Sequence, residues 1–350
     1  MHPELLRYSC QINLPGFDEN TQQKLQNAKV LVVGAGGLGC PSAQYLAAAG
    51  IGTLAIADDD TISIGNLHRQ ILYTPAEVGK KKVLIATEKL QQQNPQIRLV
   101  AIEQRITSDN AMQILQDFDI VLDGTDNFDT RYLLNDACVL LNKPLVYGAI
   151  YQYEGQVGVW NIANEDGTRT PNYRDVFPDV DAAQIPNCAE GGVLPTLAGI
   201  IGCMQANEAI KYITGTGELL AGKILMLDAQ TLQSRIIKIG AVSKTTITQI
   251  TASFIVPAVS VNELKNNLQL YDLIDVRTEE ERRKFSIGGT HIPLDKLDEN
   301  AVSFTQHKPV LFYCASGKRS AEAVKKIKAL NKDANVYSLE GGMKAWLEQQ

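Results

Sequence analysis

Two stretches that lie far apart along the chain combine residue types suited to chemistry at a protein site. The first, VLVVGAGGLG, places Gly34, Gly36 and Gly39 at G-x-G-x-x-G spacing, with Gly37 between them. The second, VLFYCASGKRS, places Cys314 before a run of small residues and cations. Glycine-rich loops cradle phosphates, and a cysteine among cations can carry reactive sulfur. The sequence therefore predicts a nucleotide site and a reactive thiol in one protein.

The glycine motif directly follows a strand-like run and precedes a helical one, which is the context that a dinucleotide or nucleotide site requires. Backbone amides at Gly34, Gly36 and Gly39 can approach a phosphate at the start of the helix. Asp58 ends the next predicted strand, about 20 residues further on, where an acid can hold ribose hydroxyls. By itself, this motif fits NAD, FAD or ATP.

Charged and polar residues at the predicted strand ends favour a nucleotide triphosphate. A dehydrogenase needs one acid for the ribose and no cluster of cations, so an NAD-dependent oxidoreductase is disfavoured. Arg and Lys aimed at a polyphosphate stabilise the charge that develops on a leaving pyrophosphate, and a strand-end carboxylate can hold Mg²⁺. The candidate nucleotide residues are Asp58, Asp60, Asn66, Arg69, Gln70, Lys82 and Asp126, the last proposed for magnesium.

The stretch that contains Cys314 predicts an activated sulfur. A strand ends at Cys314 and a helix is predicted from near Ser320, so the residues between them form a tight loop with amides turned toward the sulfur. Such a nest, with Lys318, Arg319 and a helix N-terminus, favours a thiolate and then an anionic persulfide. Arg319 lies five positions after the cysteine, one short of the Cys-x5-Arg spacing of phosphatase loops. The spacing therefore favours sulfur transfer over phosphate-ester chemistry.

The elements that position these residues alternate between strand and helix. From Lys29 to Asp126 the pattern predicts an α/β fold with a doubly wound, mostly parallel sheet of the Rossmann type. A second alternation from near Val261 predicts a smaller α/β domain. We expect domains at 1–240 and 255–350, joined by a Thr- and Ser-rich linker at 241–254. The polar segment 163–184 is predicted to be a long loop.

Composition limits the partners and the compartment. The 350 residues include 33 basic and 39 acidic side chains, a net charge of −6, which disfavours direct binding of nucleic acid. No apolar run reaches the roughly 20 residues that span a bilayer, and the start MHPELLRYSCQ has no signal-peptide pattern. The six cysteines form no C-x-x-C pair, which is typical of a reducing compartment. We expect a cytoplasmic protein without disulfides.

An ordered series of motifs resembles the ThiF/MoeB family, the bacterial relatives of ubiquitin-activating enzymes, over nearly all of 1–240. The series is RY-x-x-Q, GAGGLG, D-x-D, NLHRQ, the lysine of GKKK, LDGTDN, EGQV and NCAEGGVLP. The resemblance implies an ATP-dependent homodimeric adenylyltransferase that acts on the C-terminal Gly-Gly carboxylate of a small ubiquitin-like sulfur carrier. It further implies that Asp58 holds the ribose, that Asn66, Arg69 and Lys82 hold the phosphates, and that Asp126 holds the magnesium.

Two departures from the family pattern stand out. Cys10 occupies the position of a family arginine that reaches across the dimer to the partner's ATP phosphates; Arg7 is a possible substitute. Asn172 and Asp175 stand where the first of the family's two zinc-binding C-x-x-C pairs would fall, and the second pair is missing from RIIKIGAVSK. An amide and one carboxylate do not replace four thiolates, so we predict no structural zinc.

Two cysteines are candidates for covalent chemistry. A lone cysteine is usually a small core residue, as we expect for Cys40, Cys138 and Cys203. The resemblance of IPNCAEGGVLP to the family's mobile-loop segment instead favours Cys188 as an acceptor of acyl or sulfur groups. With YDLIDVRTEEE upstream and LEGGMKAW downstream, 255–350 resembles a rhodanese domain, which implies that Cys314 is its persulfide carrier.

The combined prediction is adenylation of a carrier by the first domain and sulfur delivery by the second, with ATP and Mg²⁺ required. The expected sulfur donor is thiosulfate or a cysteine desulfurase. Molybdopterin synthesis, thiamine synthesis and tRNA thiolation stay open as the carrier's pathway. The alternative is a catalytically weakened regulatory module that binds the carrier or the nucleotide without turnover, because the family arginine is replaced by Cys10.

Overall fold

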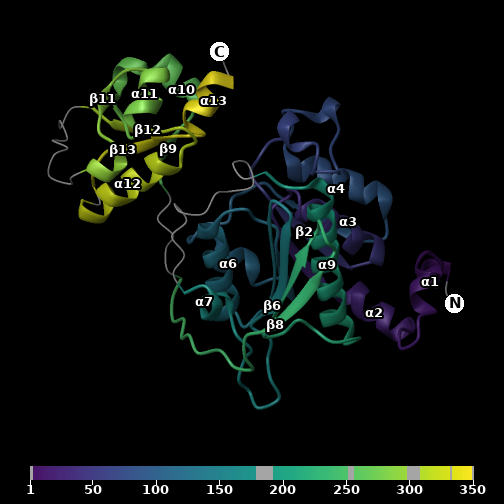
Figure 1. The fold of residues 1–350 in the computed structure, drawn as a ribbon. Coiled ribbons are helices and arrows are strands. Elements are labelled where there is room, and N and C mark those ends of the chain that lie inside the picture. The colour runs from purple at the N-terminus through teal and green to yellow at the C-terminus, as the bar shows by residue number, and fades with distance from the viewer. Residues whose placement is uncertain (1–2, 179–191, 251–255, 298–307, 332, 349–350) are drawn as a thin grey trace. The chain divides into compact units, whose positions relative to one another are not determined.

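The computed structural model describes residues 3–178, 192–250, 256–297, 308–331 and 333–348 (Figure 1). The chain divides into two compact units, Met1–Ser253 and Phe254–Gln350. Each unit is built on its own sheet with helices packed against it. Among the described helices, none has the length and apolar character to cross a membrane.

One sheet organises the first unit. Its eight described strands lie in the order β3-β2-β1-β4-β5-β6-β7-β8. The five strands from β3 to β5 are parallel, and β6, β7 and β8 extend the sheet in antiparallel pairs. This arrangement confirms the predicted mostly parallel, doubly wound sheet. The strands are β1 Lys29–Val33, β2 Thr53–Ala57, β3 Arg98–Ile102, β4 Ile120–Asp123, β5 Leu145–Tyr151, β6 Glu154–Trp160, β7 Lys223–Asp228 and β8 Ser234–Lys238.

Strand β1 shows why the sheet lies between two layers of helices. Its sequence, KVLVV, is apolar at consecutive positions, as expected for a parallel strand with both faces covered. Val30 and Val32 join one hydrophobic cluster, whereas Leu31 and Val33 join a second cluster on the opposite face. Because side chains alternate along a strand, both faces need a helical cover.

Helices α2, α3, α4 and α9 cover the first face, and α5, α6 and α7 cover the second (Figure 1). The longest, α9, packs along α3 and across β5 and β6. The helices of this unit are α1 Ser9–Ile12, α2 Glu19–Asn27, α3 Gly39–Ala49, α4 Lys82–Gln93, α5 Ala111–Leu115, α6 Phe128–Leu140, α7 Tyr173–Val176 and α9 Pro195–Thr214, with short 3-10 turns η1 Pro3–Tyr8, η2 Ile64–Asn66 and η3 Pro75–Glu77.

The segment 163–184 differs from the predicted long loop over its described part. Ala163 pairs with Arg169 in an isolated bridge, and helix α7 follows. A reciprocal capping box between Asn172 and Asp175 starts that helix, and Tyr173 is buried in the core. Residues 179–184 lie outside the described part of the chain.

Asp175 ties the segment after β8 back onto the first unit. Its carboxylate accepts hydrogen bonds from the Ser243 hydroxyl at 2.7 Å and from the Lys244 and Thr245 amides at 2.8 Å each. The Thr245 hydroxyl also donates to it at 2.8 Å, and the Asn172 side chain donates to the Ser243 hydroxyl at 2.9 Å. At the positions where the family pattern has zinc-binding cysteines, the described residues thus form a hydrogen-bonded clasp.

The second unit is a smaller, all-parallel sheet in its described part. The order of its strands is β11-β10-β12-β13-β9. The strands are β9 Ala258–Val259, β10 Asp272–Asp275, β11 Thr290–His291, β12 Val310–Tyr313 and β13 Val336–Leu339. The helices are α10 Val261–Asn266, α11 Glu279–Lys284, α12 Lys318–Leu330 and α13 Gly342–Glu348, with turns η4 Leu268–Leu270 and η5 Leu294–Lys296.

We predict that Asp175→Asn destabilises the first unit, because the amide has one acceptor oxygen where the carboxylate has two. Burial alone would raise the pKa of Asp175, but the Ser243, Asn172, Thr245 and Lys244 donors together hold it below its usual 3.8. The carboxylate therefore stabilises the fold at neutral pH, and this contribution disappears as acid protonates it. We expect a loss of about 1–3 kcal/mol in the free energy of unfolding at pH 7, shrinking below about pH 4.

Urea unfolding at pH 7 and at pH 3.5 measures this difference, and Asp166→Asn is the matched control, since Asp166 accepts only from Thr168 within its own turn in the described contacts. EDTA should leave both transitions unchanged, because hydrogen bonds rather than thiolate ligands hold the segment. A chelator-sensitive transition, or equal losses in the two variants, would contradict the prediction.

Candidate functional site

The predicted nucleotide residues gather where the chain crosses from one side of β1 to the other in the first sheet. From β1 the chain builds β2 and β3 on one side and then crosses to β4 on the other side of β1. Val33, Ala57 and Asp123 end the neighbouring strands β1, β2 and β4, so the loops that follow share one edge. Open α/β sheets bind ligands at this switch point.

Glycines let the two central loops touch through their backbones. Gly34 has φ +95°, and a methyl group on it would lie 2.7 Å from the Gly124 carbonyl oxygen. A methyl group on Gly39 would lie 1.8 Å from the Gly34 carbonyl oxygen, which leaves no room for any other residue. These contacts bring the start of α3 against the β1 loop and that loop against the residues that follow β4.

Gly36 and Gly37 face side chains instead of backbone. A methyl group on Gly36 would meet the Gln70 amide nitrogen at 3.6 Å, and one on Gly37 would meet Arg69 carbons at 3.5 Å. Gln70 is buried, yet its Oε1 accepts no hydrogen bond from the described residues. An unpaired carbonyl beside the glycine loop is costly to keep, so it marks a place where a ligand can donate a hydrogen bond.

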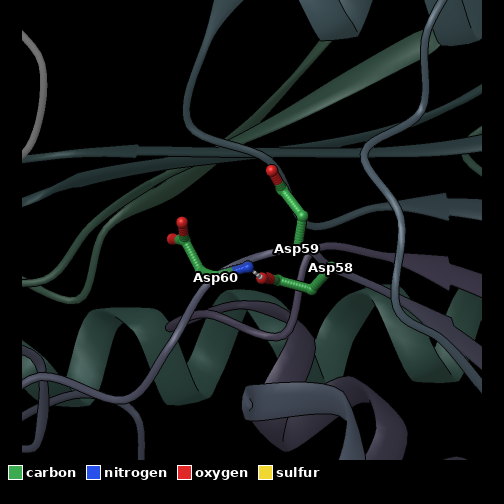
Figure 2. Close-up of side chains that lie close together, drawn as sticks. All are labelled: Asp58, Asp59 and Asp60. Carbon is green, nitrogen blue, oxygen red and sulfur yellow. Dashed lines mark hydrogen bonds between the residues drawn. The ribbon is translucent and has the colours of Figure 1, made fainter. Parts of the chain in front are cut away.

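Asp58 is largely committed to holding the glycine loop. One of its oxygens accepts from the Ala35 amide at 2.7 Å. The other accepts from the Asp60 amide at 2.8 Å, as Figure 2 shows. Burial raises the pKa of Asp58, and the nearby charge of Lys82 partly opposes that rise. Asp58, Asp59 and Asp60 each offer a carboxylate oxygen within 4.8 Å of the others. The buried Lys82 ammonium pairs with Asp60 at 2.8 Å and compensates part of this negative charge.

Arg69 and Asn66, which the resemblance assigns to the phosphates, contact each other. The Arg69 guanidinium donates to the Asn66 side-chain oxygen at 3.1 Å, and its other arm lies 2.7 Å from His68 Nε2. Partial burial and the Arg69 charge lower the pKa of His68, so the imidazole is neutral at pH 7 and can accept from the guanidinium. The contacts hold the cation near Gly37 without neutralising it.

A buried ion pair that sequence reasoning missed shapes the loop that presents Asp126. Asp123 accepts from the Thr125 amide at 2.9 Å and from Arg131 Nε at 3.1 Å, and Arg131 donates to the Thr125 carbonyl at 3.1 Å. The guanidinium also lies 5.2 Å from the Tyr147 ring centre. Asp126 itself is exposed just beyond these bonds. The sequence signal for a buried carboxylate partner was an arginine next to the apolar residues of α6.

In the second unit, Cys314 lies directly after β12 and is fully buried. The Gly317 amide donates to its sulfur at 3.1 Å, and the Ser320 hydroxyl lies 3.6 Å from the same sulfur. Gly317 has φ +91°, which turns its amide inward, and α12 begins at Lys318, two residues earlier than predicted. The loop therefore does direct a backbone amide at the sulfur.

Arg319 is held by a carboxylate that the sequence analysis did not single out. Its guanidinium makes two hydrogen bonds to Glu281, at 2.8 and 2.6 Å. Chiefly because of this contact, the pKa of Glu281 falls to about 2. Thr278 contributes further donors to the same carboxylate, so α11 fixes the position of the arginine. Asp275 and Arg277 form a second, buried ion pair beside Cys314's strand.

The start of α13 supports the cysteine loop from behind. The Met343 amide donates to the Cys314 carbonyl at 2.8 Å, and the Lys344 amide donates to the Ala315 carbonyl at 2.9 Å. A methyl group on Gly342 would lie 2.4 Å from the Cys314 carbonyl oxygen. The second glycine of LEGG is thus required by close packing against the cysteine loop.

The remaining candidates are Arg7 and the cysteines other than Cys314. Cys188 falls in the part of the chain that the structure does not describe, so its role stays a prediction. Cys10 is exposed on α1, and Arg7 donates to the Gln93 carbonyl at 3.1 Å. Cys40 and Cys138 are buried, and burial raises the pKa of both thiols, which agrees with core positions.

Fold and sites together define a class of protein: a nucleotide-binding α/β unit with cations and carboxylates at its switch point, followed by an α/β unit that holds one cysteine in a loop of amides. Residues 8–247 match the ThiF family, and residues 260–349 match the rhodanese-like domain. The chain belongs to the ThiF family and carries a rhodanese-like domain after its first unit. Both resemblances seen in the sequence are confirmed.

Full-length relatives share this architecture. The chain is 38% identical to a protein named probable adenylyltransferase/sulfurtransferase MoeZ from Mycobacterium tuberculosis, over 99% of this chain and 93% of the relative. It is 36% identical to adenylyltransferase and sulfurtransferase MOCS3 from Drosophila grimshawi, over 99% and 84%. A sulfur carrier protein adenylyltransferase from Thermus thermophilus is 48% identical over 65% of this chain and 84% of the relative.

These findings confirm that the protein is an enzyme that combines adenylylation with rhodanese sulfur transfer. The alternative of a binding module without turnover finds no support among the relatives named above. A crystal structure of Escherichia coli MccB with ATP resembles the fold at a TM-score of 0.59 and 22% identity, over 67% of this chain and 72% of that one. At that identity the likeness concerns the fold alone.

We predict that Arg131→Met lowers the free energy of unfolding by about 3–5 kcal/mol, because it leaves the Asp123 carboxylate buried without its cation. Adding Asp123→Asn should restore much of the loss, since the amide removes the buried charge and keeps an acceptor for Thr125. Urea unfolding followed by Trp160 fluorescence in a Trp346→Phe background reports on the first unit alone, because the chain has two tryptophans. A double variant no more stable than Arg131→Met would contradict this account.

Proposed function

We propose that the first unit uses ATP·Mg²⁺ to adenylate the C-terminal Gly-Gly carboxylate of a small ubiquitin-like sulfur carrier, and that the second unit delivers sulfur to form a thiocarboxylate. The observation that carries the proposal is the pairing of a switch-point site rich in fixed charges with a cradled cysteine in one chain. Names of the full-length relatives, which join the two activities, support it. The name of the Thermus thermophilus relative supports a sulfur carrier as the acceptor.

The groups at the switch point suit the demands of adenylation. A carboxylate is a poor electrophile, and attack on the α-phosphorus of ATP converts it into an acyl-adenylate while pyrophosphate leaves. Arg69, Asn66 and Lys82 oppose the charge that develops on the leaving pyrophosphate. The exposed Asp126 would hold Mg²⁺, which would supply neutralisation of the phosphate charge. Positioning and charge therefore supply most of the rate.

Asp58 and Gln70 bind the nucleoside end in this proposal. Each oxygen of Asp58 retains a lone pair after its backbone contacts, so the carboxylate can accept from ribose hydroxyls. Gln70 offers its unpaired Oε1 close to Gly36. The glycine amides then face the phosphates at the start of α3.

The second unit supplies sulfur through a persulfide. The Cys314 thiolate attacks the outer sulfur of thiosulfate, an S–S bond forms, and the S–S bond of thiosulfate breaks as sulfite leaves with the electron pair. A cysteine desulfurase can load the same thiol. The carrier's acyl group passes from AMP to Cys188, and the persulfide's terminal sulfur displaces the Cys188 thiolate from it. That thiolate then attacks the Cys314 sulfur, which frees the thiocarboxylate and leaves a disulfide between the cysteines for an external thiol to reduce.

We also propose how the protein assembles and in which compartment it acts. We propose a homodimer in the cytoplasm, where free thiols persist, with 1–240 and 255–350 as the working domains and 241–254 between them. The family's trans-acting arginine is replaced by Cys10, so another cation must serve the partner's phosphates; Arg7 is the candidate on η1.

Adenylation should depend on Asp126 and Arg69. We predict that Asp126→Ala and Arg69→Ala each lower carrier-dependent ATP–pyrophosphate exchange by at least about a hundredfold, the effect of removing a preorganised charge contact. Arg98→Ala is the control, because Arg98 is exposed at the opposite, amino end of β3. Exchange close to that of the wild type in both site variants would refute the proposed nucleotide site.

Sulfur transfer should depend on Cys314 and adenylation should not. We predict that Cys314→Ala abolishes thiosulfate sulfurtransfer and carrier thiocarboxylation but leaves pyrophosphate exchange nearly intact. Cys188→Ala should also preserve exchange and impair thiocarboxylation, because it removes the acyl acceptor. Mass spectrometry of the carrier's C-terminus after incubation with ATP and a sulfur donor measures both variants. Full thiocarboxylation by Cys314→Ala would show that the second unit is not the sulfur source.

A further inference from the structure

Two buried serines, Ser320 and Ser338, form a chain of hydroxyl contacts that begins at the Cys314 sulfur. Ser320 is fully buried and Ser338 is 3% exposed. The Ser320 hydroxyl oxygen lies 3.6 Å from the sulfur, 2.7 Å from the Ser338 hydroxyl and 3.0 Å from the Gly317 carbonyl. Ser338 comes from β13 and Ser320 from the first turn of α12, so tertiary packing brings the pair together.

The contacts give the Ser320 proton three possible acceptors: the Gly317 carbonyl, the Cys314 sulfur and the Ser338 hydroxyl. When Cys314 is a neutral thiol, the Ser320 hydroxyl can donate to the Gly317 carbonyl. When the sulfur is anionic, the same hydroxyl can rotate and donate to it, because a charged acceptor forms the stronger bond. Ser338 can donate to the Ser320 oxygen in both states, which polarises the Ser320 hydroxyl and strengthens its donation. The switch requires rotation of one hydroxyl and no movement of heavier atoms.

The charged groups around the sulfur are engaged with one another. Arg319 makes its two hydrogen bonds to Glu281, and Arg277 makes a buried pair with Asp275. Lys318 also has an interaction partner. Among the described contacts, the donors that reach the sulfur itself are the Gly317 amide, at 3.1 Å, and the Ser320 hydroxyl.

We propose that Ser320 is a further catalytic residue of sulfur transfer, donating its hydrogen bond to the anionic Cys314 sulfur, and that Ser338 is the positioning residue that orients it. This inference rests on the proposed role of Cys314 as the persulfide carrier. The contact matters most when the persulfide is discharged. Cyanide attacks the outer sulfur and breaks the S–S bond, and in carrier transfer an external thiol attacks Cys188 and breaks its bond to Cys314. In both steps the electron pair returns to the Cys314 sulfur, so a donor to that sulfur stabilises the leaving thiolate.

The test uses the full-length chain and two independent readouts. The first is the pH dependence of Cys314 alkylation by iodoacetamide, measured as modification of its peptide by mass spectrometry. The second is the rate of discharge of thiosulfate-loaded protein by cyanide, measured as thiocyanate. Ser320→Ala should raise the midpoint of the alkylation profile by about one pH unit and slow discharge by about tenfold, since it removes a hydrogen bond to a charged group.

Ser338→Ala should shift both readouts in the same direction by a smaller amount, and Ser320→Thr should restore them in part because the hydroxyl is kept. Ser286→Ala is the matched control: its hydroxyl lies 3.0 Å from the Tyr313 hydroxyl, one residue before Cys314, and its effect on both readouts should be negligible. A Ser320→Ala midpoint equal to that of the wild type, or equal shifts in Ser286→Ala and Ser320→Ala, would overturn the proposal.

Failure of this inference is distinguishable from failure of the proposed function. If thiosulfate adds no sulfur mass to Cys314 in the wild type, the proposed persulfide role of Cys314 is refuted. The alkylation profile then still decides whether Ser320 stabilises the thiolate. If Cys314 is loaded and discharged normally in Ser320→Ala with an unshifted profile, the persulfide role stands and the role of Ser320 falls. If Ser320→Ala does not fold, Ser338→Ala decides by the same profile.

Discussion

Backbone contact between two loops is the constraint on which the nucleotide site depends. Gly34 touches Gly124, and Gly39 touches Gly34, at distances that exclude any side chain. Because of these contacts, the end of β1, the start of α3 and the loop after β4 meet at one edge. The side chains proposed for the nucleotide follow β2 or β4, the two strands that flank β1. A larger residue at Gly39 would separate the loops and disperse the charges that adenylation requires.

Carboxylates at this edge range from the buried Asp123, which serves its loop, through the partly buried Asp58 to the exposed Asp126. Asp123 holds its loop through Thr125 and Arg131, and Asp58 holds the glycine loop through the Ala35 amide. Asp126, one residue beyond that hydrogen-bonded loop, is exposed. The difference has a physical reason, because a buried charge needs fixed partners, whereas a group that binds metal and phosphate must keep its lone pairs open.

The second unit also fixes its reactive loop by backbone packing, but it presents hydrogen-bond donors to a sulfur. Its cysteine loop is fixed by close packing of Gly342 against the Cys314 carbonyl, and one amide and one hydroxyl then reach the sulfur. Glu281 engages both arms of Arg319, whose role at the sulfur stays a prediction. The cation contributes its field and anchors the loop to α11, while neutral donors make the direct contacts.

The amino-acid sequence by itself determined the fold class, the order of motifs and the family, because glycine spacing, apolar strands and strand-end charges are local patterns. Tertiary structure alone decided which partners those residues use. Arg131 forms an ion pair with Asp123, and Arg319 forms one with Glu281. The Ser338 hydroxyl contacts the Ser320 hydroxyl. Such pairs join different elements through side-chain packing. Local patterning also missed α7. Its Asp175 stands where the family pattern has a zinc-binding cysteine, and the fold brings Ser243 and Thr245 to it as hydrogen-bond donors. A local pattern specifies an element, but the hydrogen bonds of a buried polar group depend on what the rest of the chain places against it.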